Sequence, residues 1–365
     1  MIESFIKQIP QNSKIAIWGY GFCGQEIYKK IKLNREDVKL VFIVDSFNKS
    51  CELGVEVVSP KFLGDKKAEF DLLLVCTTNR LNEHLVMLDY LDIKSLSVSY
   101  ELEQYCRKLA KFALLEPKIN EVCKLLSKDE QELYRKIWDC RWKVSNEIEE
   151  YAKKNYGIRV CEPVRNYSIQ YMEFINKDAI KTLIDGGAYN GVHLFAFKKY
   201  LKNLTKVYSF EPLYDTFKSE IFDSYFKKFP ELEFIPLGLW DKEDILEFYN
   251  NDTGSRIVAG RKDVDLIKIK TTSIDEYKKQ NNLPKIDFIK LDIEGAELKC
   301  LQGAEETLLK DRPQLAISIY HSDSDMVEIP LYLAKLLKDY TFHLAHYSAV
   351  QYETVFYAIP NELRR

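Results

Sequence analysis

Ile184-Asp185-Gly186-Gly187-Ala188-Tyr189-Asn190-Gly191 sets the architecture of the C-terminal half of this chain. It follows the strand-like run 181–184 and precedes a helical stretch that extends to Lys199. Its glycines let the backbone turn tightly and approach a ligand without a Cβ in the way. Because the following helix points its N-terminal N–H groups at the same place, the stretch predicts a nucleotide-type binding loop.

Two acidic features accompany this loop. Glu211 ends the next predicted strand, 206–210, and lies 20 positions beyond Gly191, where it can accept both hydroxyls of a ribose. An acid there also repels a 2′-phosphate, which disfavours NADP. Asp292-Ile-Glu294-Gly295 ends a further predicted strand, 288–291. A doubly wound domain that binds another nucleotide is the alternative that these features leave open.

Together the features favour S-adenosylmethionine as the ligand. Trp240, just after the third predicted strand, could stack on its adenine, with a plain core aromatic as the other interpretation. The expected cofactor contacts are Asp185, Gly186, Gly187, Ala188, Asn190, Gly191, Glu211, Trp240 and Asp292.

Strands and helices alternate from about residue 166 to the end. The predicted strands are 181–184, 206–210, 234–239, 288–291, 314–320, 341–345 and 354–359, the last two as an antiparallel pair. Two more strand-like runs are 245–249 and 266–271. This order predicts an α/β domain with the seven-stranded, Rossmann-like sheet of common methyltransferases.

Five segments of this half resemble the FkbM family of methyltransferases. They are 184–188, 209–212, 288–297, 345–348 and 353–358, of which the Lys-x-Asp-x-Glu-Gly block at 290–295 is the most specific. The resemblance covers about the last 200 residues. It implies S-adenosylmethionine as methyl donor and a hydroxyl oxygen as acceptor, often on a sugar of a glycan or natural product. The sequence departs from the family at Val192-His193, where many members carry a small hydroxylated residue.

Methyl transfer to a hydroxyl needs an aligned acceptor and a group that removes its proton. Asp292 and Glu294 at one strand end and His321 at the next should converge there. We assign His321 as the base because an ordinary imidazole pKa suits neutral pH. Asp292 then orients donor or acceptor, and Glu294 binds the acceptor or braces the loop. Capping of the helix that follows is the alternative for both acids, and a surface or capping role is the alternative for His321.

A metal ion is the less favoured reading of this region. Asp292, His321 and Asp323 could hold a divalent cation that acidifies the acceptor, but their spacing is no recognised ligand motif. His346 could line the acceptor pocket or lie between core strands. His84 and His343 have no constellation around them and are read as structural.

The first hundred residues contain a second nucleotide-type loop. Gly19-Tyr-Gly21-Phe-Cys-Gly24 follows the predicted strand 14–18, and Asp45 ends the next one, 39–44. With the buried strand 70–76 these runs predict a parallel sheet. Segment 14–63 is similar to N-terminal domains of sugar acyltransferases and nucleotide-sugar enzymes, which implies a nucleotide or nucleotide sugar as ligand. A scaffold with an empty loop is the alternative.

Between these halves, residues 101–165 read as a helical connector or dimerisation element. Ser127-Lys-Asp-Glu130 is a capping-box pattern, and an apolar face follows it at Leu133, Ile137, Cys140, Val144, Ile148 and Tyr151. We therefore predict three regions: a Rossmann-like nucleotide-binding domain at 1–100, the connector, and the methyltransferase domain at 166–365.

Composition narrows the function class. The net charge of −3 and the absence of a basic stripe argue against nucleic acid as partner. Amino-methylating nucleic-acid enzymes use a motif with two adjacent prolines, and this sequence has no such pair. No apolar run is long enough for membrane insertion. Eight widely spaced cysteines fit a reducing cytoplasm. The favoured function is a sugar O-methyltransferase with a small-molecule or glycan acceptor. The rival is an interaction module that binds a nucleotide, NAD or nucleotide sugar on a non-catalytic scaffold.

Overall fold

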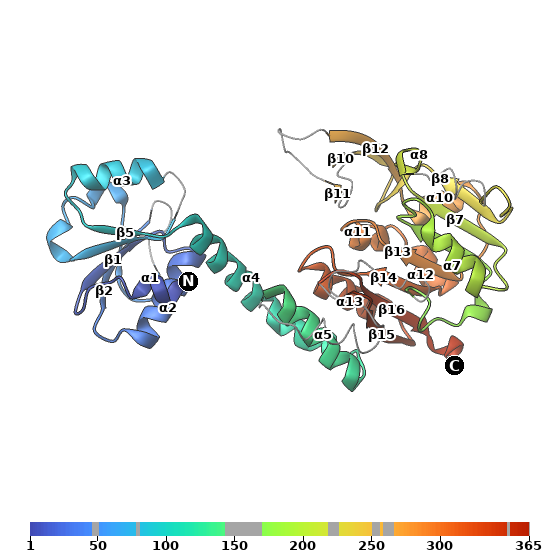
Figure 1. The fold of residues 1–365 in the computed structure, drawn as a ribbon, viewed down its shortest axis with the longest axis horizontal. Helices are drawn as coiled ribbons and strands as arrows, with labels where there is room; N and C mark the ends of the chain where they lie inside the picture. Colours follow the sequence, from blue (N-terminus) through green and yellow to red (C-terminus); the bar gives the residue numbers. More distant parts are fainter. Residues whose placement is uncertain are drawn as a thin grey trace. The chain divides into compact units, whose positions relative to one another are not determined.

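The computed structural model describes residues 1–45, 51–77, 81–142, 170–217, 226–249, 256–257, 266–348 and 351–364. The chain divides into two compact units, Met1–Leu114 and Leu115–Arg365 (Figure 1). The division falls inside helix α4 (Tyr100–Cys123), within the predicted connector at 101–165, of which 143–165 lie outside the described residues.

The first unit contains a parallel five-stranded sheet with the order β3-β2-β1-β4-β5. This is the order of the first five strands of the doubly wound dinucleotide-binding fold. The strands are β1 (Lys14–Trp18), β2 (Lys39–Val44), β3 (Glu56–Val58), β4 (Leu72–Val75) and β5 (Ser95–Ser97).

Helices cover both faces of this sheet. Side chains of α1 (Ile2–Ile6), α2 (Phe22–Asn34) and the start of α4 pack on one face in a single buried cluster. Leu88 of α3 (Leu81–Tyr90) packs on the other face with Phe42 and Leu73. Short 3₁₀ turns lie at Pro60–Phe62 and Lys67–Glu69. The alternation of small apolar strands and amphipathic helices thus buries the sheet on both sides.

The second unit is built on a seven-stranded sheet with the order β15-β16-β14-β13-β6-β7-β8. Only the pairs β14·β16 and β15·β16 are antiparallel; the others run parallel. The α/β class predicted for this half is therefore confirmed. The strands are β6 (Thr182–Gly186), β7 (Lys206–Phe210), β8 (Leu232–Ile235), β13 (Phe288–Leu291), β14 (Gln314–Ser318), β15 (Tyr340–His346) and β16 (Thr354–Pro360).

A smaller, four-stranded sheet has the order β11-β10-β12-β9. It consists of β9 (Gly238–Leu239), β10 (Asp244–Tyr249), β11 (Arg256–Ile257) and β12 (Leu266–Thr272). The strand predicted at 234–239 divides between the two sheets, with β8 in one and β9 in the other. Pro236 lies at the break and has no N–H for a sheet hydrogen bond.

Helices and short turns complete the second unit. Leu194 and Phe197 of α7 join Leu183, Phe288 and Tyr357 of the sheet in one buried cluster. Contacts also join α11 to α13 and α10 to α12. The helices are α5 (Lys128–Trp142), α7 (Val192–Tyr200), α8 (Tyr214–Phe217), α10 (Ile274–Gln280), α11 (Glu297–Gln302), α12 (Glu305–Asp311) and α13 (Asp325–Leu336), with 3₁₀ turns at Lys177–Ala179 and Asn361–Leu363. Within the described residues, no helix has both the length and the apolarity needed to span a membrane.

Helix α5 packs on the second unit. The hydroxyl of Tyr134 donates to the carbonyl of Met326 at 2.6 Å, and Glu130 accepts from the N–H of Leu344 at 3.1 Å while contacting His343 Nδ1 at 3.0 Å. Leu133 and Ile137 of the predicted apolar face are buried. These two residues are thus covered by their own chain, whereas Val144, Ile148 and Tyr151 lie outside the described residues.

We expect Glu130→Gln to destabilise the second unit by about 2 kcal/mol at pH 7. Burial alone would raise the pKa of Glu130, but its bonds to His343, Ser127 and Leu344 hold it at about 2. A depressed carboxyl pKa stabilises the fold above its unfolded value of about 4.5, and that contribution is lost as the pH falls toward 2. Urea unfolding at pH 7 and pH 3 measures both effects.

Glu132→Gln is the matched control, because Glu132 lies on the same helix, pairs with Lys136 at the surface and is 68% exposed. We expect its effect to stay below about 0.5 kcal/mol. Equal destabilisation by the two variants at pH 7 would show that Glu130 does not anchor α5.

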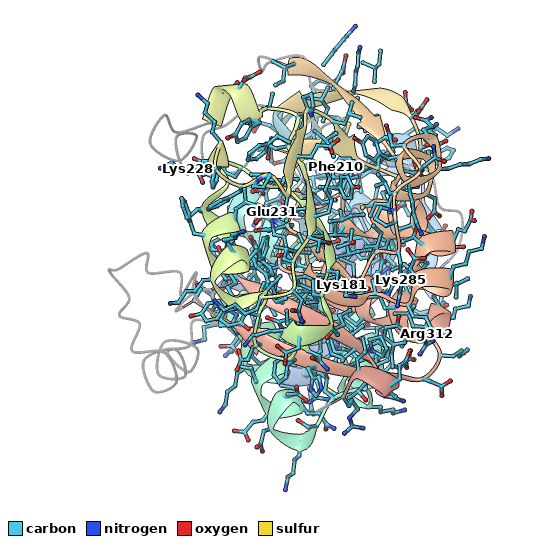
Figure 2. The ribbon with its side chains drawn as sticks, turned by 90° about the vertical axis from the view of Figure 1, so that its right-hand side faces the viewer. Lys181, Phe210, Lys228, Glu231, Lys285 and Arg312 are labelled. Atoms are coloured by element: carbon cyan, nitrogen blue, oxygen red, sulfur yellow. The ribbon has the colours of Figure 1, made fainter. Side chains whose placement is uncertain are left out.

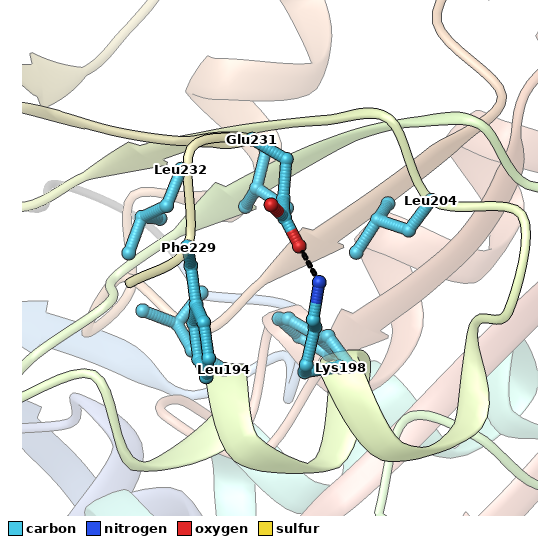
Figure 3. A pocket seen from close by; sticks show the side chains of 8 residues that line it. Leu194, Lys198, Leu204, Phe229, Glu231 and Leu232 are labelled. Carbon is cyan, nitrogen blue, oxygen red and sulfur yellow. Dashed lines mark hydrogen bonds and ion pairs between the residues drawn. The ribbon is translucent and has the colours of Figure 1, made fainter. Parts of the chain in front are cut away.

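The edge at which the parallel strands begin holds a small surface pocket. Lys181, Glu231, Lys285 and Arg312, labelled in Figure 2, come just before β6, β8, β13 and β14 and so mark this edge. The pocket lies between α7 and the starts of β7 and β8, and an ion pair between Lys198 and Glu231 crosses it (Figure 3). Its other lining residues are Leu194, Phe197, Leu204, Val207, Phe229 and Leu232. The residues predicted to be functional lie at the opposite ends of the strands.

Candidate active site

The glycine loop directly follows β6 and contacts the end of β13. Gly187 and Gly191 have φ of +74° and +82°, values that L side chains rarely adopt. A Cβ added to Gly187 would lie 1.8 Å from the carbonyl oxygen of Asp292, far inside van der Waals contact. Only glycine therefore allows the loop to lie against the acidic strand end.

Lys290, in the middle of β13, holds this loop from below. Its ammonium group donates to the carbonyls of Gly186 at 3.0 Å and Gly187 at 2.8 Å and pairs with Asp185 Oδ1 at 3.0 Å. Both charged side chains are 0% exposed. Asp185, a predicted cofactor contact, therefore acts in this structure by holding Lys290 and, through it, the loop.

Glu211 fixes the other side of the loop. One of its oxygens accepts from the N–H of Tyr189 at 3.0 Å and the other from the N–H of Leu213 at 3.0 Å. The carboxylate is buried, and this burial raises its pKa. The side-chain oxygen of Asn190 accepts from the N–H of Val192 at 3.1 Å, within the loop that leads into α7. Both residues thus order the loop, and each carboxylate oxygen of Glu211 keeps a free lone pair for a ribose hydroxyl.

Asp292 follows β13 and is held by two tyrosines. Tyr171 donates to Oδ2 at 2.9 Å and Tyr320 donates to Oδ1 at 2.8 Å. Burial would raise the pKa of Asp292, but His321, Lys290 and the two tyrosine hydroxyls lower it well below its usual range. Asp292 is therefore an ionised, rigidly oriented carboxylate at the surface of the glycine loop.

His321 lies among three carboxylates just after β14. Its Nδ1 is 3.1 Å from Glu297 Oε1, and its Nε2 is 3.4 Å from both Asp292 Oδ1 and Glu294 Oε2. Glu297 is itself held by the N–H groups of Ile293 at 2.7 Å and Gly295 at 3.0 Å. The structure thus brings Asp292, Glu294 and His321 together, as the sequence predicts, and adds Glu297.

The carboxylates change the protonation of the ring. Burial would lower the pKa of His321, but Glu297, Asp292 and Glu294 raise it to about 10. The ring therefore carries two protons at neutral pH when nothing else is bound, which argues against its predicted role as the resting base.

Glu294 has a φ of +57°, an uncommon backbone conformation of the kind that clusters at functional sites.

Other predicted residues lie apart from this group. Asp323 pairs with Arg141 of α5 at 2.9 Å, so the predicted metal set with Asp323 needs correction: Glu297 is the carboxylate beside Asp292 and His321. The Trp240 ring faces the ammonium group of Lys299 at 6.0 Å; its contact with adenine stays a prediction. His346 is buried between strands beside Thr354 Oγ1, at 2.9 Å.

Arg141, Tyr171 and Tyr320 were not identified from the sequence as residues of this site. The Arg141 guanidinium donates to the carbonyl of Tyr320 at 3.0 Å as well as to Asp323, and so fixes the segment that carries His321. Arg141 lies in a helix, Tyr171 in a turn and Tyr320 in the segment after β14, so the three form no local sequence motif. For Lys290 a signal existed, because a lysine inside the buried run 288–291 must find a partner.

The glycine loop of the first unit also follows a strand directly. Gly19 has a φ of +88°, and a Cβ on Gly24 would lie 2.4 Å from the carbonyl oxygen of Gly19. Asp45 follows β2, and its N–H donates to the carbonyl of Val58 at 3.0 Å. Gly21 has open space around it. The loop thus has the close strand–helix packing of a nucleotide-binding turn, and its ligand stays a prediction.

Comparison with one solved structure supports the fold. A crystal structure of methyltransferase FkbM from Methylobacillus flagellatus KT is similar over 98% of this chain and 92% of its own, with a TM-score of 0.51 and 18% identity. A rRNA methylase from Streptococcus thermophilus matches 55% of this chain and 97% of its own, with a TM-score of 0.32 and 15% identity. No curated protein matches the chain significantly.

A family match supports a methyltransferase domain in the second unit. Residues 185–344 match the family described as Methyltransferase FkbM domain. The FkbM resemblance of the C-terminal half is thereby confirmed.

Proposed function

We propose that the second unit is an S-adenosylmethionine-dependent O-methyltransferase that acts on a hydroxyl of a sugar. The observation that carries the proposal is the contact between the glycine loop and Asp292, where a Cβ on Gly187 would lie 1.8 Å from the Asp292 carbonyl. The expected donor loop and the acidic group around His321 therefore meet at one point. Transfer requires donor and proton acceptor to be adjacent in this way.

The residues present fit S-adenosylmethionine. Gly187 and Gly191 allow a tight turn with positive φ that packs against Asp292 and Phe226, and the N-terminus of α7 follows them. Glu211, at the end of β7, suits the two ribose hydroxyls, and Trp240 suits the adenine. When bound, the cofactor supplies an electrophilic methyl group on its sulfonium. The chain's own residues must hold the acceptor oxygen in line and take its proton.

The exposed fractions of the side chains around His321 suggest different roles for them in methyl transfer. The side chain of Glu294 is 43% exposed, whereas those of Asp292 and His321 are 14% and 8% exposed. An acceptor hydroxyl reaches Glu294 first, so Glu294 is the group that takes its proton. Asp292, fixed by two tyrosines, orients the acceptor, and His321 positions both carboxylates. His321 as the base, the role that the sequence analysis favours, is the alternative.

A sugar acceptor is supported by two features of the chain. The FkbM resemblance implies a hydroxyl on a sugar, and the first unit has a nucleotide-type loop at Gly19–Gly24 with Asp45 after the next strand. A nucleotide sugar is the class of acceptor that would satisfy both features.

The test is methyl transfer from radiolabelled S-adenosylmethionine to a panel of UDP- and GDP-sugars and to reducing oligosaccharides. We expect label in a sugar product and a drop in kcat of at least about 100-fold for Glu294→Gln, the range for removal of a general base. Glu306→Gln, on the exposed surface of α12, is the matched control.

Two results would overturn this proposal. Full activity of Glu294→Gln together with loss in His321→Ala would return the base role to His321. Folded protein that binds a nucleotide sugar but no S-adenosyl compound would favour the interaction module.

A further inference from the structure

The acidic group around His321 has the composition of a cation site. Asp292, Glu297 and His321 each offer a ligand atom, and these atoms lie within 4.8 Å of one another. Ligands bound to one first-row cation at 2.0–2.2 Å are at most about 4.4 Å apart. A closure of a few tenths of an ångström would bring all three into contact with a single ion.

The ring of His321 gives an independent indication of a ligand. Its side chain is 8% exposed, and both ring nitrogens are buried without a well-aligned hydrogen bond, although carboxylate oxygens lie 3.1–3.4 Å away. Buried polar atoms in this state call for an explanation, and a bound ion is one of the few available. A divalent cation that displaces one ring proton could be shared by a ring nitrogen and the neighbouring carboxylate oxygens.

Charge balance points the same way. Three carboxylates, those of Asp292, Glu294 and Glu297, surround one imidazole. The nearby buried ammonium group of Lys290 is already engaged by Asp185 and two carbonyls. A divalent cation would offset the remaining negative charge better than a single proton does.

Surrounding residues hold the three side chains in place. Tyr171 and Tyr320 donate to the two oxygens of Asp292, and the N–H groups of Ile293 and Gly295 donate to Glu297. Outer hydrogen bonds of this kind orient ligands and are typical of metal centres. Each carboxylate oxygen still has a lone pair for an ion.

We propose that Asp292, Glu297 and His321 bind one divalent transition-metal cation. A mixed nitrogen and oxygen set suits Mn²⁺, Fe²⁺ or Zn²⁺, whereas Mg²⁺ prefers oxygen ligands and water. The use of the cation rests on the proposed function: it would bind the acceptor hydroxyl and lower its pKa. The hydroxyl proton then passes to Glu294, and the oxygen bonds to the methyl carbon as the carbon–sulfur bond breaks.

The test is titration of the full-length, EDTA-treated and dialysed protein with MnCl₂, followed by electron paramagnetic resonance and calorimetry. We expect one Mn²⁺ per chain, weaker binding of MgCl₂, and at least 100-fold weaker Mn²⁺ binding by His321→Ala and Asp292→Asn. Glu306→Gln should bind Mn²⁺ as the wild type does. Circular dichroism melting shows which variants are folded, and Glu297→Gln supplies a third ligand variant.

The absence of Mn²⁺ binding, or equal affinity in wild type and a folded His321→Ala, would overturn the site. Titration with S-adenosylhomocysteine separates this outcome from failure of the proposed function. If the protein binds the nucleoside but no metal ion, the cation site alone is rejected. If it binds the metal ion but no nucleoside, the use of the site in methyl transfer is rejected.

Discussion

Gly187→Ala is expected to destabilise the second unit by about 3 kcal/mol or more and to abolish binding of S-adenosyl compounds. The new Cβ would lie 1.8 Å from the Asp292 carbonyl oxygen and 2.7 Å from its carbon, in backbone that cannot rotate away. The φ of +74° adds strain for any L side chain. The loop and the end of β13 must therefore separate. Urea unfolding and calorimetric titration with S-adenosylhomocysteine measure the two effects.

Gly295→Ala separates strain from collision. Gly295 has a φ of +95°, but the nearest atom to its added Cβ is His321 Cβ at 3.8 Å. We expect about 1 kcal/mol of destabilisation from the backbone conformation alone. If the two alanine variants were equally stable, the tight approach of the loop to Asp292 would not exist in solution.

Lys290→Met is expected to destabilise the second unit by about 3–5 kcal/mol, because it leaves the Asp185 carboxylate buried and unpaired. It also removes both hydrogen bonds to the Gly186 and Gly187 carbonyls. Urea unfolding followed by circular dichroism measures the change. Lys299→Met, at a site that is 48% exposed and pairs with Asp241, should shift stability by less than about 0.5 kcal/mol.

The double variant Lys290→Met/Asp185→Asn tests the cause. Removal of the buried charge should restore about 2 kcal/mol relative to Lys290→Met, because an unpaired neutral amide is less unfavourable than an unpaired carboxylate. A double variant as unstable as the sum of its parts would show that the ion pair is not the reason for the loss.

The sequence predicted most of the second unit's fold because its strands follow the apolar pattern of buried parallel sheets. The strand expected at 234–239 nevertheless divides at Pro236 between two sheets. Helix α5 showed an apolar face, but nothing local indicates that Glu130 meets His343, 213 residues away. The spacing of apolar residues predicts that one face of a helix is buried. It does not predict which distant segment packs on that face.

The sequence predicted that Asp292, Glu294 and His321 would meet, but not which side chains hold them in place. Asp292, Glu294 and His321 were expected to converge because neighbouring parallel strands end at one edge. Tyr171 reaches Asp292 from 121 positions away, and no motif marks it. The protonation of His321 depends on Glu297, which sequence alone reads as an ordinary first-turn helix acid.

Binding of S-adenosylhomocysteine to the full-length protein tests the central claim most directly. Isothermal titration calorimetry should show one nucleoside per chain, and a ligand concentration of about 100 times Kd should stabilise the second unit by about 2.7 kcal/mol. Gly187→Ala should show neither heat nor stabilisation. A folded wild-type protein that binds no S-adenosylhomocysteine or S-adenosylmethionine would contradict the account.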